Sequence, residues 1–214
     1  MASSFFNPQS KATRFLTALA NLILVNFIFI ITSIPVFTLG ASVTALYRIT
    51  IAIIAGDNPS VIKDYWKSFK ENFLKATGLF LFYCATTAFF LFEIYMVRTM
   101  MDPEYGWSSY PAYFFLCLIA ASSFYAFPLL AWFHESFPQL LKNSILIAIT
   151  NLPITIMYIV ISAGLAYVCY QFPTITLSIM IFIGISGLAV FYSVFLKRIF
   201  KKLGAEISFS EKDN

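Results

Sequence analysis

Long apolar runs, with the basic residues confined to the gaps between them, dominate this sequence. Residues 15–37 contain no charged side chain, and residues 77–97 contain only Glu93. An α-helix rises about 1.5 Å per residue, so each run is long enough to cross a hydrocarbon core about 30 Å thick. Inside such a core the backbone must satisfy its own hydrogen bonds, which favours helices. The pattern predicts an all-α integral membrane protein.

Composition limits the chain to a single membrane domain. Of its 214 residues, 60% are hydrophobic and 11% are charged, whereas a soluble domain carries about a quarter charged residues. Little sequence is left for a separate soluble domain, so we expect residues 1–214 to form one integral membrane domain in contact with the lipid bilayer. The basic residues are scattered at membrane boundaries, which argues against nucleic-acid binding.

Six segments are predicted to cross the membrane as a polytopic helical bundle. Segment 39–55 is short and contains Arg48, so the sequence leaves open whether it spans the bilayer or re-enters. Six crossings with both termini cytoplasmic place every Lys and Arg except Arg48 and Arg98 on the inner side, as the positive-inside rule requires. We therefore expect a multi-pass protein of the cell membrane. The predicted segments are residues 15–37, 39–55, 76–97, 111–133, 144–167 and 175–196.

The loop between the second and third segments has the pattern of an amphipathic cytoplasmic helix. Asn58-Pro59-Ser60 is a helix start signal. Over residues 59–75, apolar side chains recur every three or four positions with lysines between them. Such a helix lies on the inner membrane surface or against a partner protein. The candidate partner-docking residues on it are Tyr65, Trp66, Phe69 and Phe73.

A second cytoplasmic connection covers residues 134–143. Pro138 interrupts it, which predicts a brief separate helix before the fifth segment. Glu135 and Lys142 are further candidate docking residues there.

Arg48 and Glu93 are the charged residues within the predicted segments. A charge at the bilayer centre costs about 2.5–3.5 kcal/mol on insertion scales, so Arg48 should face the bundle interior, water or a counter-ion. Arg48 is then either a contact for a substrate or ion, or a structural polar tie. Glu93 is predicted nearer the outer surface, so the sequence does not decide whether the two residues pair.

Two proline motifs resemble each other, TSIPV at residues 32–36 and TNLPI at residues 150–154. Each places hydroxyl or amide side chains before a proline, where they can bond the carbonyls that the proline frees. Matching broken helices mark the binding site of some transporters, whereas single kinks are common in membrane helices. The sequence leaves both interpretations open.

Sequence motifs for catalysis are absent. The chain has no phosphate-binding Gly-x-x-x-x-Gly-Lys-Ser/Thr loop, no His-Glu-x-x-His pair and no Gly-x-Ser-x-Gly elbow. Its single histidine, His134, cannot build a multi-histidine metal site. We therefore predict a non-enzymatic protein with no catalytic residue, no cofactor and no metal site.

Short stretches in a defined order carry a family resemblance. They are Phe5-Phe6-Asn7, Arg14-Phe15-Leu16, residues 33–42, residues 68–73, Phe127-Pro128-Leu129-Leu130, Leu141-Lys142-Asn143 and Leu152-Pro153. In this order, over nearly the whole chain, they resemble the YesL-like integral membrane proteins of Gram-positive bacteria, a domain family of unknown function. Relatives are encoded beside sugar-uptake transporters and polysaccharide-degrading enzymes. The resemblance thus implies an auxiliary role in carbohydrate import and no defined activity.

Residues 135–153 are also distantly similar to the cytoplasmic coupling loop of binding-protein-dependent permeases, through Glu135 and Leu152-Pro153. The Ala-Ala pair and the central Gly of that loop are missing, which favours an ordinary helix–turn–helix connection.

Two functions are compatible with these features. The first is an auxiliary or stabilising subunit associated with the permease subunits of a carbohydrate ABC importer. The alternative is a stand-alone permease for a small solute, with a path near Arg48. The sequence leaves open whether the chain forms homo-oligomers.

Overall fold

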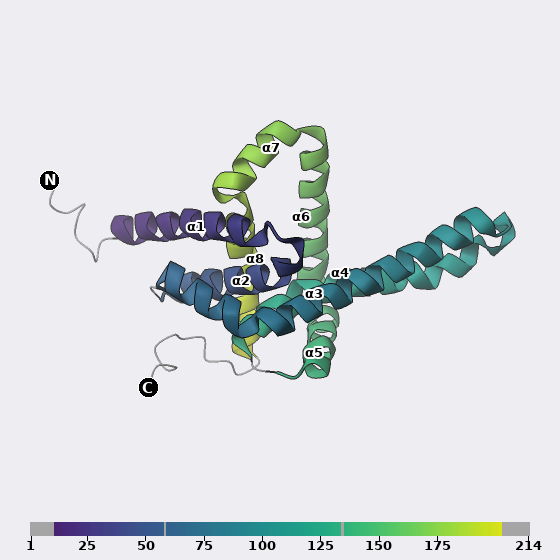
Figure 1. The fold of residues 1–214 in the computed structure, drawn as a ribbon, viewed down its shortest axis with the longest axis horizontal. Coiled ribbons are helices and arrows are strands. Elements are labelled where there is room, and N and C mark those ends of the chain that lie inside the picture. The colour runs from purple at the N-terminus through teal and green to yellow at the C-terminus, as the bar shows by residue number, and fades with distance from the viewer. Residues whose placement is uncertain (1–10, 58, 134, 203–214) are drawn as a thin grey trace.

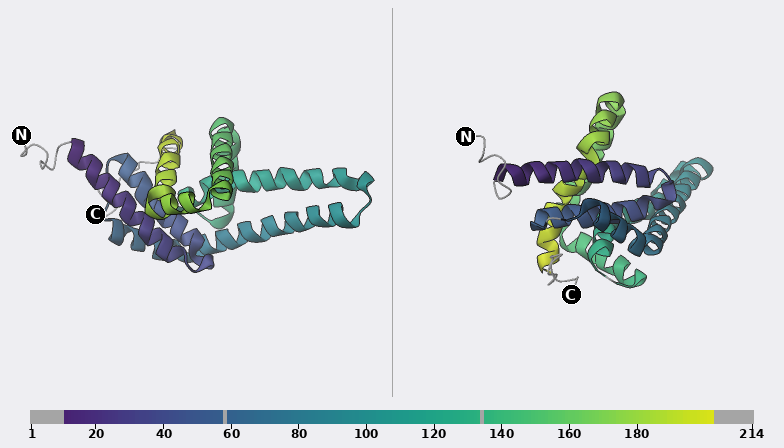
Figure 2. Two further views of the ribbon diagram at one scale, coloured as in Figure 1. Left: turned by 90° about the horizontal axis from the view of Figure 1, so that it is seen from above. Right: turned by 60° about the vertical axis from the view of Figure 1, so that its left-hand side comes forward.

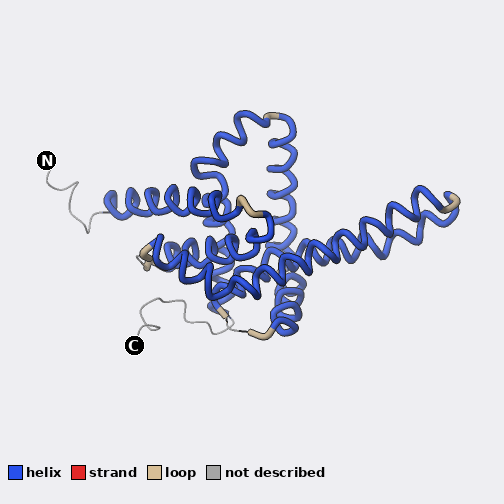
Figure 3. Tube along the Cα trace, viewed as in Figure 1, coloured by secondary structure: helices blue, strands red, loops and turns tan. Residues whose placement is uncertain are grey.

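The computed structural model describes residues 11–57, 59–133 and 135–202, and each of its elements is a helix joined to the next by a short loop or directly (Figure 3). The predicted all-α fold is confirmed. The elements are α1 (Lys11–Ser33), η2 (Val36–Thr38), α2 (Leu39–Ala55), α3 (Val61–Met100), η3 (Pro103–Ser109), α4 (Tyr110–Trp132), α5 (Phe137–Thr150), α6 (Leu152–Gln171), α7 (Pro173–Ile179), η4 (Met180–Gly184) and α8 (Ile185–Lys202) (Figure 1). Several residues used above lie outside the described residues: Phe5, Phe6, Asn7, Asn58, His134, Lys212 and the side chains of Lys11 and Arg14.

The structure has six stretches that are long and apolar enough to cross a membrane. Their number matches the six predicted segments, so the chain is a multi-pass membrane protein. α2 has the predicted bounds and is about 26 Å long at 1.5 Å per residue. Within the described residues the six stretches are Phe15–Ser33, Val36–Ala55, Val61–Met100, Glu104–Trp132, Leu152–Gln171 and Pro173–Lys202.

The helices form three hairpins that share one base. α1 and α2 turn at η2, α3 and α4 turn at η3, and α6 returns through α7 and η4 to α8 (Figures 1 and 2). The base is the region where the C-terminal ends of α2, α4 and α8 meet: Lys197 Nζ lies 3.0 Å from the Ile54 carbonyl, and the rings of Phe133 and Phe200 are 5.4 Å apart. From this base the α3–α4 hairpin and the α6–α7 arm project in different directions (Figure 1).

α2 lies at the centre of the packing. In its candidate membrane span 67% of the residues are buried, against 11% in the span of α6. Helices α1, α3, α4 and α8 all pack against it, and its core side chains include Ala45, Ile49 and Ile51. The outer parts of the α3–α4 hairpin and of the α6–α7 arm expose aliphatic and aromatic side chains such as Phe92 and Val160, as expected for lipid-facing helices.

Both proline motifs separate two helices, whereas the sequence placed each motif inside a single predicted segment and left open whether it breaks or kinks the helix. α1 ends at Ser33, before the predicted end of the first segment at residue 37. α5 ends at Thr150 and α6 begins at Leu152. The predicted segment 144–167 is therefore wrong, because it joins the end of one helix to the next. Pro153 stands in the first turn of α6, where its missing N–H group costs no hydrogen bond.

Hydroxyl groups close the corner between α1 and α2. The Thr32 hydroxyl lies 2.6 Å from the Tyr65 hydroxyl of α3 and accepts a hydrogen bond from Ser42 Oγ at 3.0 Å. Thr38 Oγ1 donates to the Pro35 carbonyl at 2.6 Å. The polar side chains around Pro35 thus satisfy groups that the broken helix leaves unpaired.

α3 is one unbroken helix of 40 residues, about 60 Å long. The sequence predicted a separate amphipathic helix over 59–75, but residues 61–75 are the first part of α3 and continue directly into the predicted span 76–97. Because α3 is about twice as long as the hydrocarbon core is thick, a perpendicular crossing would leave about half of the helix outside the core.

Candidate functional site

Arg48 ties α2 to the C-terminal end of α4. Its Nη1 donates a hydrogen bond to the Ala131 carbonyl at 3.2 Å, and its guanidinium carbon lies 4.1 Å from the centroid of the Trp132 ring. The last carbonyls of a helix have no intrahelical partner and carry partial negative charge, so a cation is stabilised there. A guanidinium over an indole ring adds a cation–π contact. These contacts are those of a structural tie.

Glu93 lies in a different part of the molecule from Arg48. It is half-buried on the outer part of α3, where Phe90 stacks on Phe115 of α4 with ring centroids 5.2 Å apart. Arg48 bonds α4 at Ala131, which is about 24 Å further along that helix than Phe115. The structure therefore does not bring the two candidate residues together.

Replacing Arg48 by glutamine is expected to lower the free energy of unfolding by about 1–3 kcal/mol, because the α4 carbonyl loses a charged donor and Trp132 loses its cation. Arg48→Lys should recover part of this loss, since lysine keeps the charge without the planar group. Equilibrium unfolding in mixed detergent micelles measures both variants. Wild-type stability of Arg48→Gln would contradict the structural role.

Two lysines bind main-chain carbonyls at the base as Arg48 does. Lys197 of α8 donates to the Ile54 carbonyl in the last turn of α2 at 3.0 Å. Lys75 of α3 donates to the Glu135 carbonyl, in the link between α4 and α5, at 3.3 Å. Arg48 and Lys197 thus meet carbonyls at the C-terminal ends of α4 and α2, where the helix dipole favours a cation, whereas Lys75 holds the α4–α5 link.

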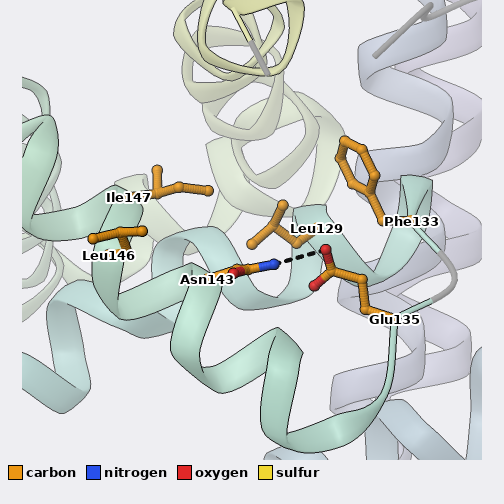
Figure 4. A pocket seen from close by; sticks show the side chains of 6 residues that line it. All are labelled: Leu129, Phe133, Glu135, Asn143, Leu146 and Ile147. Atoms are coloured by element: carbon orange, nitrogen blue, oxygen red, sulfur yellow. Dashed lines mark hydrogen bonds between the residues drawn. The ribbon is translucent and has the colours of Figure 1, made fainter. Parts of the chain in front are cut away.

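A pocket of about 250 Å³ lies between the end of α4 and the middle of α5 (Figure 4). Leu129 and Ile147 are buried in it, whereas Leu146 is 54% exposed at its edge. Figure 4 shows the side chains of Glu135 and Asn143 pointing toward one another. The pocket combines an apolar wall with one polar pair. It is lined by Leu129, Phe133, Glu135, Asn143, Leu146 and Ile147.

The carboxylate of Glu135 is only partly satisfied. Its Oε1 accepts a hydrogen bond from Asn143 Nδ2 at 2.7 Å. Its Oε2 is buried and has no hydrogen-bond partner among the described residues. Lys75 donates its hydrogen bond to the main-chain oxygen of Glu135 and not to the carboxylate. Glu135 therefore presents an unused acceptor in the pocket.

The candidate docking residues of α3 differ in burial: Phe69 and Phe73 are partly buried against the core, whereas Tyr65 and Trp66 are the two extremes. Tyr65 is fully buried and its hydroxyl bonds Thr32, so the prediction that Tyr65 contacts a partner is wrong. Trp66, one position further around the helix, is 42% exposed. Its ring lies 5.5 Å from that of Phe69, which lies 5.6 Å from that of Phe73. We call Trp66, Phe69 and Phe73 the aromatic ridge.

Sequence reasoning missed Asn143 and Lys75 as partners of Glu135. Lys142, the other candidate docking residue of this connection, is exposed on α5. Glu135 precedes α5 while Asn143 lies within it, so helical periodicity gives no signal that the two side chains meet. Within residues 11–57, 59–133 and 135–202, no three His, Cys, Asp or Glu residues are grouped so that they could hold a metal ion.

Comparison with known proteins gives one family. Residues 22–94 match the family described as "Protein of unknown function, DUF624". The match covers about a third of the chain, from within α1 to the outer part of α3. It includes Arg48 and the aromatic ridge, and it excludes α4, α5 and the Glu135 pocket. No curated protein and no solved structure gives a match.

Proposed function

We propose that this chain is a non-enzymatic auxiliary or stabilising subunit that docks onto another membrane protein. The partner class that the YesL-like resemblance suggests is the permease of a carbohydrate ABC importer. The proposal places the protein in the cell membrane with the base, and both termini, on the cytoplasmic side.

The observation that carries the proposal is the aromatic ridge on the first part of α3. Its ring contacts hold three side chains in a fixed row, and Trp66 at its end is substantially exposed. Lys63, Lys67 and Lys70 are exposed beside it. Rigid aromatic anchors flanked by charges are typical of the residues that dominate protein–protein binding. The same composition at a bilayer surface would also contact head groups, so the experiment must separate the two.

The position of the basic residues supports the cytoplasmic orientation of the base. The lysines of the first part of α3 and those at the end of α8 come from chain segments whose helix ends meet there. Under the positive-inside rule this end faces the cytoplasm. In this orientation the aromatic ridge, Glu135 and Lys142 are presented to the cytoplasmic parts of a partner.

The test is purification of the tagged chain from its native membrane in mild detergent, with identification of the co-purified proteins by mass spectrometry. We expect stoichiometric recovery of importer permease subunits, reduced about tenfold or more by Trp66→Ala, because exposed tryptophan anchors at interfaces commonly contribute more than about 1.4 kcal/mol. Trp107→Ala is the matched control. Trp107 is 66% exposed in η3, at the opposite end of the α3–α4 hairpin.

Three results would count against the proposal. They are recovery of the chain alone, recovery only as a homo-oligomer, and equal recovery with the two tryptophan variants. The first two would favour the stand-alone permease. That alternative predicts solute movement by the purified chain in liposomes, abolished by Arg48→Ala in a variant that remains folded.

A further inference from the structure

The strongest chemical signal that the proposed function leaves unused is the free acceptor of Glu135. An ionised carboxylate has about four lone-pair sites, and this one receives a single hydrogen bond, from Asn143. Its second oxygen is buried, and no donor reaches it from the part of the chain that the structure describes. Buried polar atoms in folded proteins are nearly always paired, so an unpaired one needs a specific explanation. A bound group that donates hydrogen bonds is one.

The side chains that line the pocket indicate the size and polarity of the bound group beyond its hydrogen-bond donor. Leu129, Phe133, Leu146 and Ile147 are apolar and face the space beside the carboxylate (Figure 4). A volume of about 250 Å³ is below the roughly 300–1,000 Å³ of pockets for drug-sized ligands. The pocket therefore suits a small charged end with a few methylene groups. A divalent metal ion fits poorly, because Ca²⁺ and Mg²⁺ take six or more oxygen ligands.

The residues around the pocket indicate the charge of the group that binds in it. A neutral donor would leave the negative charge of Glu135 without compensation in a largely apolar site, whereas an ammonium group supplies both hydrogen bonds and charge. Lys75 is exposed, and its ammonium donates a hydrogen bond to the Glu135 main-chain oxygen at 3.3 Å. Its ammonium can therefore meet an anionic group that lies next to the bound cation.

We propose that the pocket between α4 and α5 binds a primary ammonium group on a short alkyl stem, with Glu135 Oε2 as the acceptor and Leu129, Phe133, Leu146 and Ile147 around the stem. The ethanolamine head group of a phospholipid carries this chemistry, with its phosphate placed to reach Lys75. A water-soluble alkylamine carries the ammonium and stem alone. The site lies in the chain itself, so it does not depend on the partner proposed above.

The experiment measures the melting temperature of the purified full chain in detergent during titration with three probes. They are dihexanoyl phosphatidylethanolamine, dihexanoyl phosphatidylcholine and n-butylamine. A ligand that binds only the folded state raises the melting temperature by mass action. We expect phosphatidylethanolamine to raise it and phosphatidylcholine to have little effect, since the choline nitrogen has no N–H donor. A rise with butylamine as well shows that the ammonium and stem suffice; a rise with the lipid alone assigns the site to the head group.

Glu135→Gln should weaken phosphatidylethanolamine binding about tenfold or more, because it removes a charge-assisted hydrogen bond. Glu104→Gln is the matched control, on an exposed residue of η3. If Glu135→Gln unfolds the chain, Leu146→Trp provides the second test. Leu146 is exposed at the edge of the pocket, so an indole there should fill the space while the Glu135–Asn143 bond remains.

Equal shifts with the ethanolamine and choline lipids would overturn the proposal. Unchanged binding in both Glu135→Gln and Leu146→Trp would do the same. Because these measurements use the chain alone, they are independent of whether an importer subunit co-purifies.

Discussion

Alanine in place of Gly40 is expected to lower the free energy of unfolding by about 3 kcal/mol or more, and valine by more still. Gly40 lies in the first turn of α2, where that helix approaches the backbone of α3 most closely. A methyl group there would overlap the Ala76 carbonyl oxygen and stand 2.9 Å from Phe80 Cβ. Overpacking commonly costs about 1–3 kcal/mol, and a backbone obstacle cannot turn aside as a side chain can. Equilibrium unfolding in mixed detergent micelles measures the loss.

The matched control is Gly78→Ala on α3. A β-carbon on Gly78 would meet no atom within 4 Å, so we expect a change of less than about 1 kcal/mol, in the stabilising direction that helix propensity gives. If Gly40→Ala and Gly78→Ala were equally stable, the close contact between α2 and α3 would not exist in the membrane protein. Small residues at such contacts let membrane helices approach, because van der Waals packing drives their association.

Leucine in place of Asn26 is expected to lower the free energy of unfolding by about 3 kcal/mol. Asn26 is fully buried on α1 and its amide donates to the carbonyls of Met180 at 3.0 Å and Ile181 at 2.7 Å. Its oxygen accepts a hydrogen bond from the Ser186 N–H at 2.9 Å. The two carbonyls belong to η4, a π-helix, and Ser186 follows it; the altered bonding register of a π-helix leaves main-chain groups to be satisfied from outside. Each lost bond is worth about 1 kcal/mol, and the groups left behind remain buried.

The same unfolding assay, with hydrogen exchange of residues 176–186, measures this effect. Exchange there should become faster in Asn26→Leu than in the wild type, because α1 no longer holds η4. Asn21→Leu is the control: it lies on the same helix and is half-buried, and the structure shows no side-chain hydrogen bond for it within the described residues. Similar stability of the two variants would show that the amide does not hold the π-helix.

The number of membrane helices could be predicted because hydrophobic length is a local property. The runs at 39–55, 76–97 and 111–133 each lie almost entirely within one helix, and α2 has the predicted ends at residues 39 and 55, whereas the run at 144–167 is shared by α5 and α6. The helix breaks were harder to place. The motifs at Pro35 and Pro153 were recognised in the sequence. Apolar residues continue on both sides of each proline, so a prediction from the length of the apolar run places both sides in one segment, whereas the helices end or begin there. The sequence did not predict that α3 is continuous. Its first part is charged, which suggests the end of a membrane segment, but no residue in it interrupts a helix.

The candidate sites were predicted only in part. Arg48 stands out in any sequence of this kind because a charge in an apolar run is costly. Arg48 contacts a main-chain carbonyl and the Trp132 ring of α4. Neither group is charged, so a search of the sequence for an oppositely charged partner does not find them. The aromatic spacing of α3 identified a helix face, but it did not distinguish the buried Tyr65 from the exposed Trp66.

The sequence by itself determined that the chain belongs in a lipid bilayer, its all-α fold class and the number of candidate membrane helices, because these depend on the free energy of transferring each segment from water to lipid. The tertiary structure alone decided which polar groups meet. Asn26 reaches η4 from 154 residues away, Arg48 reaches α4, and the Glu135 pocket forms where the α4–α5 link folds beside Asn143. Hydrogen bonds and close contacts act over about 3–4 Å, so they depend on how helices cross and not on the order of residues along the chain.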